Sequence, residues 1–182
     1  MQQITYPVRV MKFMGVKYLF VSNASGGMNP DYEVGDLMVQ NDHINLLPNP
    51  LIGKHYTEFG SRFPDMSEPY DMNLISLALS IAKKLNIKLH TGCYVGVTGP
   101  TLETPAEYKY FRSIGGDTVG MSTIPEVIVA CQMGLRCFAV SVITDLGIEG
   151  RISKVTLEEV IEAAVKAAPK MTVIMEKMIE SL

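Results

Sequence analysis

Short apolar runs rich in β-branched residues alternate along this chain with stretches of helical periodicity. The apolar runs are VKYLFVS (16–22), DLMVQ (36–40), CYVGVT (93–98) and CFAVSVIT (137–144). Several of them lack a polar face, which is typical of strands that helices cover on both sides. The stretch 69–86 has helical spacing, with one apolar face made of Leu74, Leu77, Ala78, Ile81 and Leu85. This alternation predicts the α/β class.

Capping boxes predict where three helices begin. The pairs are Thr104 with Glu107, Thr123 with Glu126, and Thr156 with Glu159. In this motif the threonine hydroxyl accepts from the third helical amide, and the glutamate carboxylate accepts from the threonine amide. We expect the last helix, from about 157 to 180, to be interrupted or kinked near Pro169, because proline has no N–H to donate.

Residues 41–68 form the one long irregular stretch that the sequence predicts. It contains prolines at positions 48, 50 and 64 and glycines at 53 and 60. A loop of this length in a compact domain is usually functional or in contact with a partner. We therefore expect a function or an oligomer contact here, with a plain surface excursion as the alternative.

Length and composition limit the class of protein. At 182 residues the chain is expected to form one domain (1–182), since a domain of that size removes roughly 70% of its unfolded surface from water. The net charge of −3, without a run of Lys or Arg, argues against nucleic-acid binding. No apolar run has the length of about 18 residues that membrane insertion needs. Three cysteines without CxxC spacing favour a reducing cytoplasm over a disulfide framework or a zinc site.

Three of the predicted strands end in short segments that carry small or polar residues: FVSNASGG, GVTGPTLETPAE and SVITDLG. The carboxyl ends of strands in α/β proteins meet at one crevice, where small ligands bind. Residues 23–27 have almost no side-chain bulk, so a ligand can approach the main chain there. A tight turn would explain the same composition.

Five residues near these ends are candidates for chemistry. Glu103 can accept hydrogen bonds from a ligand, or merely complement the positive end of the following helix. Met121 and Ser122 precede a helix start, where Ser122 can offer a hydroxyl to an anion. Asp145 follows a buried strand and is either functional or a turn residue. His43 can act as a base or as a ligand, although a lone histidine beside a strand end is more often structural.

The motifs SNASGGMNP, EVGDLM, NDHIN, RFPDMSEPYD, GPTLETPAEY and VGMSTIPEVIVA resemble those of the trimeric, low-molecular-mass purine nucleoside phosphorylases, in the same order and at the same spacing. The resemblance runs from about Tyr6 to the C-terminus. It implies a three-layer phosphorylase fold with a central mixed β-sheet and a homotrimer. It also implies reversible phosphorolysis of purine ribonucleosides and deoxyribonucleosides, with inorganic phosphate as co-substrate and no metal or organic cofactor.

The same resemblance implies a role for each matching residue. The backbone at Ala24 and the hydroxyl of Ser122 contact phosphate, and Met121 lies near the ribose. Glu103 accepts the purine N1–H and, in guanine, a hydrogen of the exocyclic amine. The base pocket also includes Ser25, Gly26, Val119 and Gly120, and Phe59 reaches the site of the neighbouring subunit.

Three residues depart from the family pattern within the pocket. Leu102 replaces an aromatic residue that packs on the base, and Leu157 replaces a histidine that hydrogen-bonds the sugar 5′-hydroxyl. Asp145 replaces an asparagine typical of enzymes for 6-oxopurines. A protonated Asp145 can serve as the acid for N7 and preserve the use of inosine and guanosine, whereas an ionised Asp145 favours a 6-amino group.

A larger departure lies at the front of the chain. The family carries a long N-terminal segment with a Ser/Gly-rich phosphate loop and an Arg-x-His pair, and these have no counterpart in MQQITYPVRV. We therefore expect the domain to lack its N-terminal portion. The alternative function is a catalytically inactive fragment that retains purine binding or an oligomerisation surface.

Overall fold

The computed structural model describes all 182 residues and confirms the α/β class. The strands are β1 (Tyr18–Gly27), β2 (Leu37–Asn45), β3 (Leu89–Gly96), β4 (Thr118–Gly120) and β5 (Arg136–Leu146). The helices are α1 (Gln2–Phe13), α2 (Met72–Lys84), α3 (Pro105–Ser113), α4 (Ile124–Gln132), α5 (Leu157–Ile179) and the short 3-10 helix η1 (Thr57–Phe59).

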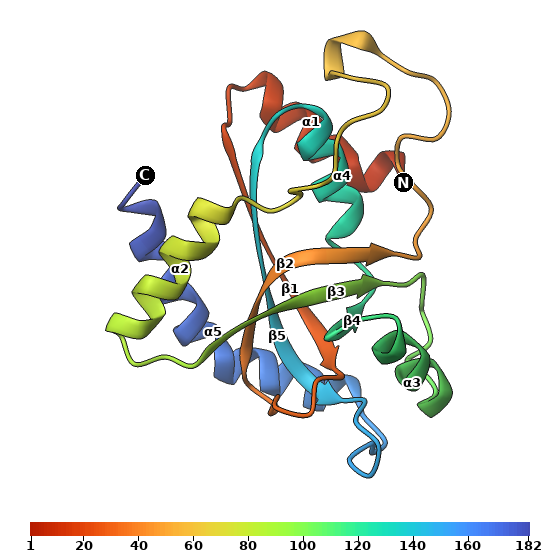
Figure 1. Cartoon of the computed structure of the whole chain (residues 1–182), viewed down its shortest axis with the longest axis vertical. Helices are drawn as coiled ribbons and strands as arrows, with labels where there is room; N and C mark the ends of the chain where they lie inside the picture. Colours follow the sequence, from red (N-terminus) through yellow and green to blue (C-terminus); the bar gives the residue numbers. More distant parts are fainter.

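The strands form one mixed sheet that closes on itself in the order β1-β4-β3-β2-β5 (Figure 1). The pairs β1–β5, β2–β3 and β3–β4 are parallel, and β1–β4 and β2–β5 are antiparallel. The mixed sheet agrees with the sequence prediction, which did not include its closure into a barrel. The closure brings the ends of β1, β4 and β5 together: Gly26 pairs with Val119 on one side and with Asp145 on the other.

Strand β1 is longer than the sequence predicts. The small residues Asn23 to Gly27 continue the strand and do not form a turn. Glycine, asparagine and serine are poor strand formers in isolation, but tertiary context overrides that preference. Here β5 pairs with the whole of β1 and β4 pairs with its last two residues. Likewise, Asp145 lies inside β5 and not after it.

Two further segments differ from the prediction. Residues 41–45 belong to β2, so the irregular stretch begins at residue 46 and is interrupted by η1. Helix α1 was not predicted, because Pro7 lies inside it and only Thr5 and Val8 are buried. It packs against α4.

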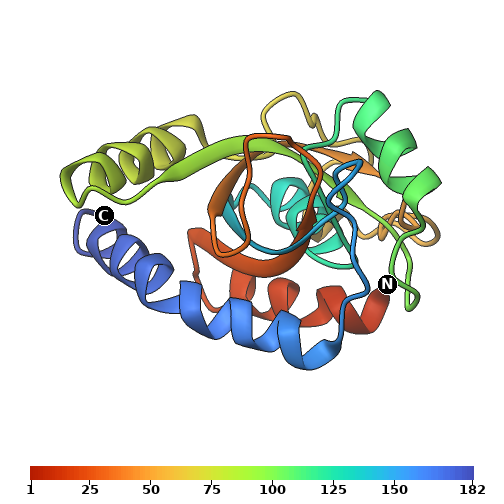
Figure 2. The same cartoon turned by 90° about the horizontal axis from the view of Figure 1, so that it is seen from below.

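Helix α5 contacts β5 and α2, and its buried residues are Ala163, Ala167, Ile174 and Met178. The prediction of an interruption at Pro169 is wrong, because the helix is continuous through this residue. The predicted kink fits Figure 2, which shows α5 changing direction part-way along as it follows the sheet. None of the helices combines the length and the apolar character needed to cross a bilayer.

The predicted helix starts are correct at Thr104, Thr123 and Thr156. The boxes at Thr104 and Thr156 each contain both hydrogen bonds. At Thr123 the Glu126 carboxylate accepts from the threonine amide at 3.1 Å. The Thr123 hydroxyl also accepts from the side-chain amide of Asn23 in β1.

Candidate active site

Asp145 lies at the centre of the candidate site, next to the end of β1. Its Oδ2 accepts a 3.0 Å hydrogen bond from the Tyr108 hydroxyl, and its Oδ1 accepts one of 3.0 Å from Thr144 Oγ1. A Cβ on Gly26 would lie 3.0 Å from Asp145 Oδ2 and 3.2 Å from Tyr108 Oη. The bare backbone of β1 thus makes room for this pair of side chains.

Glu103 lies in the loop between β3 and α3, close to the same tyrosine. Burial raises the pKa of its carboxyl because the charged form loses water, and the negative charge of Asp145 acts in the same direction. Hydrogen bonding from its own backbone and from Tyr108 partly opposes this increase in pKa. The two predicted carboxylates, Glu103 and Asp145, therefore both lie close to the hydroxyl group of Tyr108.

The end of β4 joins this group from another side. Val119 and Gly120 are buried, and Gly120 pairs with the end of β3 at Gly96. The tyrosine hydroxyl of Tyr94 accepts a 3.3 Å hydrogen bond from the amide of Ser122. This bond anchors the backbone that follows β4. The side chain of Met121 in the same segment is partly exposed.

The start of α4 is tied to β1 by a pair of side chains that the sequence analysis did not single out. Asn23 Nδ2 donates to Thr123 Oγ1 at 2.7 Å, and the Ser122 hydroxyl lies 3.2 Å from the same oxygen. Asn23 Oδ1 is buried without a partner. Because Ala24 follows Asn23 directly, the two predicted phosphate contacts, Ala24 and Ser122, lie next to a shared hydrogen bond.

The structure does not bring every predicted residue into this group. Leu157 begins α5 and is 69% exposed, and Leu102 is 53% exposed beside Glu103. Phe59 packs on Phe13 and on the guanidinium of Arg9, which lies 4.5 Å from the ring centre. Figure 1 shows that the segment around η1 lies near α1 and away from α3.

His43 belongs to a buried hydrogen-bond chain. Its Nδ1 lies 3.1 Å from the Tyr70 hydroxyl, which donates to Gln40 Oε1 at 2.8 Å, and Gln40 Nε2 donates to Ser141 Oγ at 3.0 Å. Burial lowers the pKa of His43. These contacts fit the structural interpretation of this histidine.

Asp145 and Thr144 line a cavity of about 420 Å³ between the end of β5 and α5, and Arg151 and Lys154 are on its wall. A second cavity, of about 540 Å³, is lined by Tyr108, Lys109 and the segment from Gly147 to Gly150. The hydrogen bond from Tyr108 to Asp145 therefore connects the linings of the two cavities.

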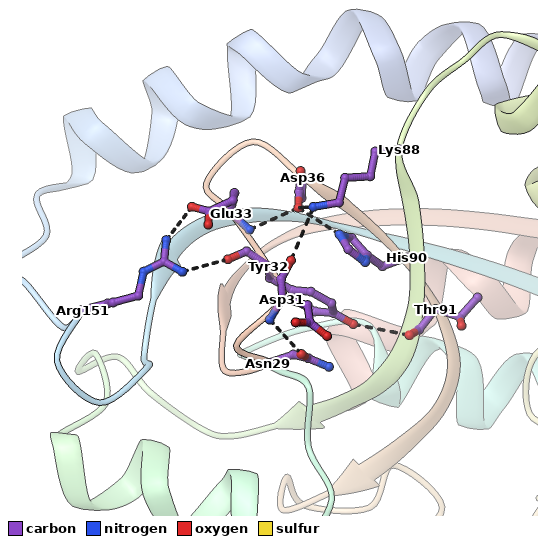
Figure 3. A network of polar contacts seen from close by, with 9 residues as sticks. All are labelled: Asn29, Asp31, Tyr32, Glu33, Asp36, Lys88, His90, Thr91 and Arg151. Carbon is purple, nitrogen blue, oxygen red and sulfur yellow. Dashed lines mark hydrogen bonds and ion pairs between the residues drawn. The ribbon is translucent and has the colours of Figure 1, made fainter.

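A polar network includes Arg151, which lines the first cavity (Figure 3). Arg151 forms an ion pair with Glu33 in the connection between β1 and β2. The amide of Glu33 donates to Asp36 Oδ2 at 3.1 Å, and the same oxygen accepts from Lys88 at 2.8 Å and lies 2.9 Å from His90 Nε2. The network links the segment after β5 to the first residues of β3.

Sequence reasoning missed Tyr108, Thr144 and Asn23. Tyr108 is buried on α3 together with Phe111, so its spacing is that of a core position. Thr144 lies at the end of an apolar strand, where nothing distinguishes it from a strand-forming threonine. Asn23 was visible as part of NASGG, but its partner Thr123 is 100 residues away.

Residues 1–180 match the sequence model of the phosphorylase superfamily. The chain is 54% identical over 146 residues to purine nucleoside phosphorylase 1 of Bacillus subtilis, covering 80% of this chain and 54% of that protein. It is 47% identical over 177 residues to the purine nucleoside phosphorylase of Bos taurus, covering 93% of this chain and 61% of that protein. The chain thus spans between half and two thirds of the length of these relatives.

Solved structures give the same result for the fold. A Schistosoma purine nucleoside phosphorylase in complex with hypoxanthine superimposes with a TM-score of 0.93 at 43% identity, over 98% of this chain and 66% of that one. The Schistosoma mansoni enzyme in complex with adenosine gives a TM-score of 0.94 at 42% identity, over 98% and 67% of the two chains.

Proposed function

The chain belongs to the phosphorylase superfamily and, within it, to the purine nucleoside phosphorylases, and on this premise we propose that it forms the base pocket of an enzyme that cleaves purine nucleosides with phosphate. The products are the free base and ribose 1-phosphate or deoxyribose 1-phosphate. The single observation that supports this most is the pair of carboxylates near the Tyr108 hydroxyl, with Glu103 in the loop between β3 and α3 and Asp145 near the end of β5.

Each carboxylate suits a different edge of a purine. Glu103 accepts the N1–H and, in guanine, the exocyclic amine, because a carboxylate has acceptor sites on both oxygens. Asp145 faces the N7 and 6-substituent edge. Gly26, Val119 and Gly120 form walls with little side-chain bulk, against which the flat base packs.

In the proposed reaction, a phosphate oxygen forms a bond to C1′ as the bond from C1′ to the purine N9 breaks. The electron pair of the broken bond stays on the purine, which takes a proton at N7 from Asp145 in its protonated form or from water. Positioning of the phosphate and stabilisation of the departing base are therefore the main tasks of the protein. We assign phosphate to the backbone of Ala24 and the hydroxyl of Ser122, and the ribose to Met121 and Leu157.

Inosine and guanosine are the proposed substrates, and adenosine is the discriminating comparison. Thr144 and Tyr108 both donate to Asp145. Asp145 can accept from a 6-amino group if it is ionised, and it can serve as the acid for N7 if it is protonated. Faster turnover of adenosine than of inosine would overturn our preference for 6-oxopurines. Leu157 has no hydrogen-bonding group for the sugar 5′-hydroxyl, so 5′-deoxyinosine and inosine should be turned over equally.

The proposal extends to assembly and location. We propose a homotrimer in which Phe59 and the segment around it reach a neighbouring subunit. Inorganic phosphate is the co-substrate, and no metal or organic cofactor is part of the proposal. The three cysteines are free, which supports a reducing cytoplasm as the location.

The test follows hypoxanthine release from inosine, with and without phosphate, by the protein expressed from its full reading frame. We expect release that depends on phosphate and a loss of about 100-fold in kcat/KM for Glu103→Gln. Release that does not need phosphate would contradict phosphorolysis. Hypoxanthine binding without any turnover would favour the inactive, purine-binding alternative.

A further inference from the structure

Tyr108 occupies a place that two glycines leave open. A Cβ on Gly147 would lie 2.0 Å from Tyr108 Cδ1, so the tyrosine ring rests directly on the backbone after β5. A Cβ on Gly26 would lie 3.2 Å from Tyr108 Oη. The ring therefore lies against the backbone that follows β5, and the hydroxyl lies close to the end of β1, although the residue itself is on α3.

The hydroxyl of Tyr108 is the donor, and not the acceptor, of its hydrogen bond with Asp145. Burial raises the pKa of this phenol far above the physiological range, and the charges of Asp145 and Glu103 add to the increase. The group therefore stays protonated and acts as the donor to Asp145 Oδ2 at 3.0 Å. Thr144 donates to the other oxygen, so both oxygens of Asp145 are held by hydroxyl groups.

We propose that Tyr108 is a positioning residue of the purine pocket, whose hydroxyl fixes the side chain of Asp145 and shares its hydrogen-bonding capacity with Glu103. This inference rests on the proposed function, because it concerns the same pocket. One hydroxyl close to both carboxylates links the group that faces the N1 edge of the base to the group that faces the N7 edge. The removal of that hydroxyl should weaken recognition of the base without removing either carboxylate.

The variant Tyr108→Phe removes the hydroxyl and keeps the ring on Gly147. Tyr110→Phe is the matched control, because Tyr110 is on the same helix and 55% exposed. We expect guanine to bind about tenfold more weakly to Tyr108→Phe, the usual effect of losing a hydrogen bond to a charged group, and with unchanged affinity to Tyr110→Phe. Both variants should keep the melting temperature of the parent within a few degrees.

A double-mutant cycle with Asp145→Ala separates positioning from a general structural role. If Tyr108 acts through Asp145, then Tyr108→Phe should have a clearly smaller effect on guanine affinity when residue 145 is already alanine, where only the contact with Glu103 remains to be lost. An equal loss of affinity in both backgrounds would overturn the proposal.

A second measurement does not need the protein to bind a purine. Carboxyl ¹³C NMR titration reads the pKa of Glu103 directly, in the presence of the neighbouring groups Asp145, Glu107, Tyr94 and Tyr108. Because Tyr108 lowers the pKa of Glu103, Tyr108→Phe should raise it, whereas Tyr110→Phe should leave it unchanged. An unchanged Glu103 titration in Tyr108→Phe would overturn the inference even in a protein that binds purine. If guanine does not bind but the titration moves, the proposed function fails and the contact of Tyr108 stands.

Discussion

The side-chain amide of Asn23 donates a 2.7 Å hydrogen bond to the hydroxyl of Thr123 and so joins the middle of β1 to the residue before α4. The Ser122 hydroxyl lies 3.2 Å from the same threonine oxygen. The backbone of Thr123 has φ of 67°, in the left-handed region that threonine rarely adopts. The bond to Asn23 therefore helps to hold an unfavourable conformation next to the proposed phosphate contact.

Asn23→Ala should raise the KM for phosphate several-fold and leave the KM for inosine nearly unchanged. The reason is that Thr123 and Ser122 lose their anchor, whereas the carboxylates of the base pocket do not. The cost in stability should be about 1 kcal/mol or less, since the substitution also removes the buried, unpaired Asn23 Oδ1. Steady-state kinetics at varied phosphate checks this, with the exposed Asn41→Ala as control. An equal rise of both KM values would refute it.

Asp71 gives a prediction about pH. Its side chain accepts from the amides of Asn73 and Leu74 as the cap of α2, and hydrogen bonding from Arg136 holds the pKa of Asp71 below its ordinary value. A carboxyl of this kind stabilises the fold above its unfolded pKa, near about 4, and the contribution disappears as pH falls through the lower folded pKa.

Asp71→Asn keeps the cap but loses the charge, so it should cost about 1 kcal/mol at pH 7. Asp71→Ala should cost about 1 kcal/mol more, because the cap is lost as well. Urea unfolding at several pH values measures both. The difference between the parent and Asp71→Asn should shrink as the pH falls below about 4. A difference that stays constant with pH would contradict the ion pair.

Gly147→Ala should destabilise the protein by about 1 to 3 kcal/mol, because the new methyl group overlaps the ring of Tyr108. In a Tyr108→Ala background the ring is absent and the same substitution should cost much less. Denaturant unfolding of the four proteins measures this coupling. Equal costs in the two backgrounds would show that the ring does not rest on Gly147.

Pro169→Ala should stabilise the protein, by up to about 3 kcal/mol, because an alanine in the interior of α5 restores a backbone hydrogen bond and helix propensity. The neighbouring exposed residue Lys170, changed to alanine, is the control. Thermal unfolding checks the direction. A lower melting temperature for Pro169→Ala would mean that the bend of α5 is needed for its two halves to pack.

The sequence predicted those parts of the fold that depend on local signals. The capping threonines mark the starts of α3, α4 and α5, and the apolar runs mark β2, β3 and β5. The sequence did not predict the structure where pairing between strands decides it. Residues Asn23 to Gly27 have low strand propensity, and they form a strand because β4 and β5 pair with them. The sequence also failed to predict α1, whose interior proline is compensated by packing on α4.

The candidate site divides in the same way. Glu103 and Asp145 were recognisable because each polar residue follows a buried strand or precedes a capped helix. Tyr108 was not, because a tyrosine at helical spacing from Phe111 is indistinguishable in sequence from a core residue. Only the closed sheet shows that its hydroxyl reaches β5. The roles of Leu102, Leu157 and Phe59, like those of all the other predicted site residues, stay predictions.

Calorimetric titration of the protein with hypoxanthine tests the central claim most directly, with Glu103→Gln as the variant. Glu176→Gln is the matched control, since it makes the same change of charge on an exposed residue of α5. We predict that hypoxanthine binds, that Glu103→Gln weakens binding at least about tenfold, and that Glu176→Gln leaves it unchanged. Equal affinity of the parent and Glu103→Gln, or no binding at all, would contradict a purine pocket at this site.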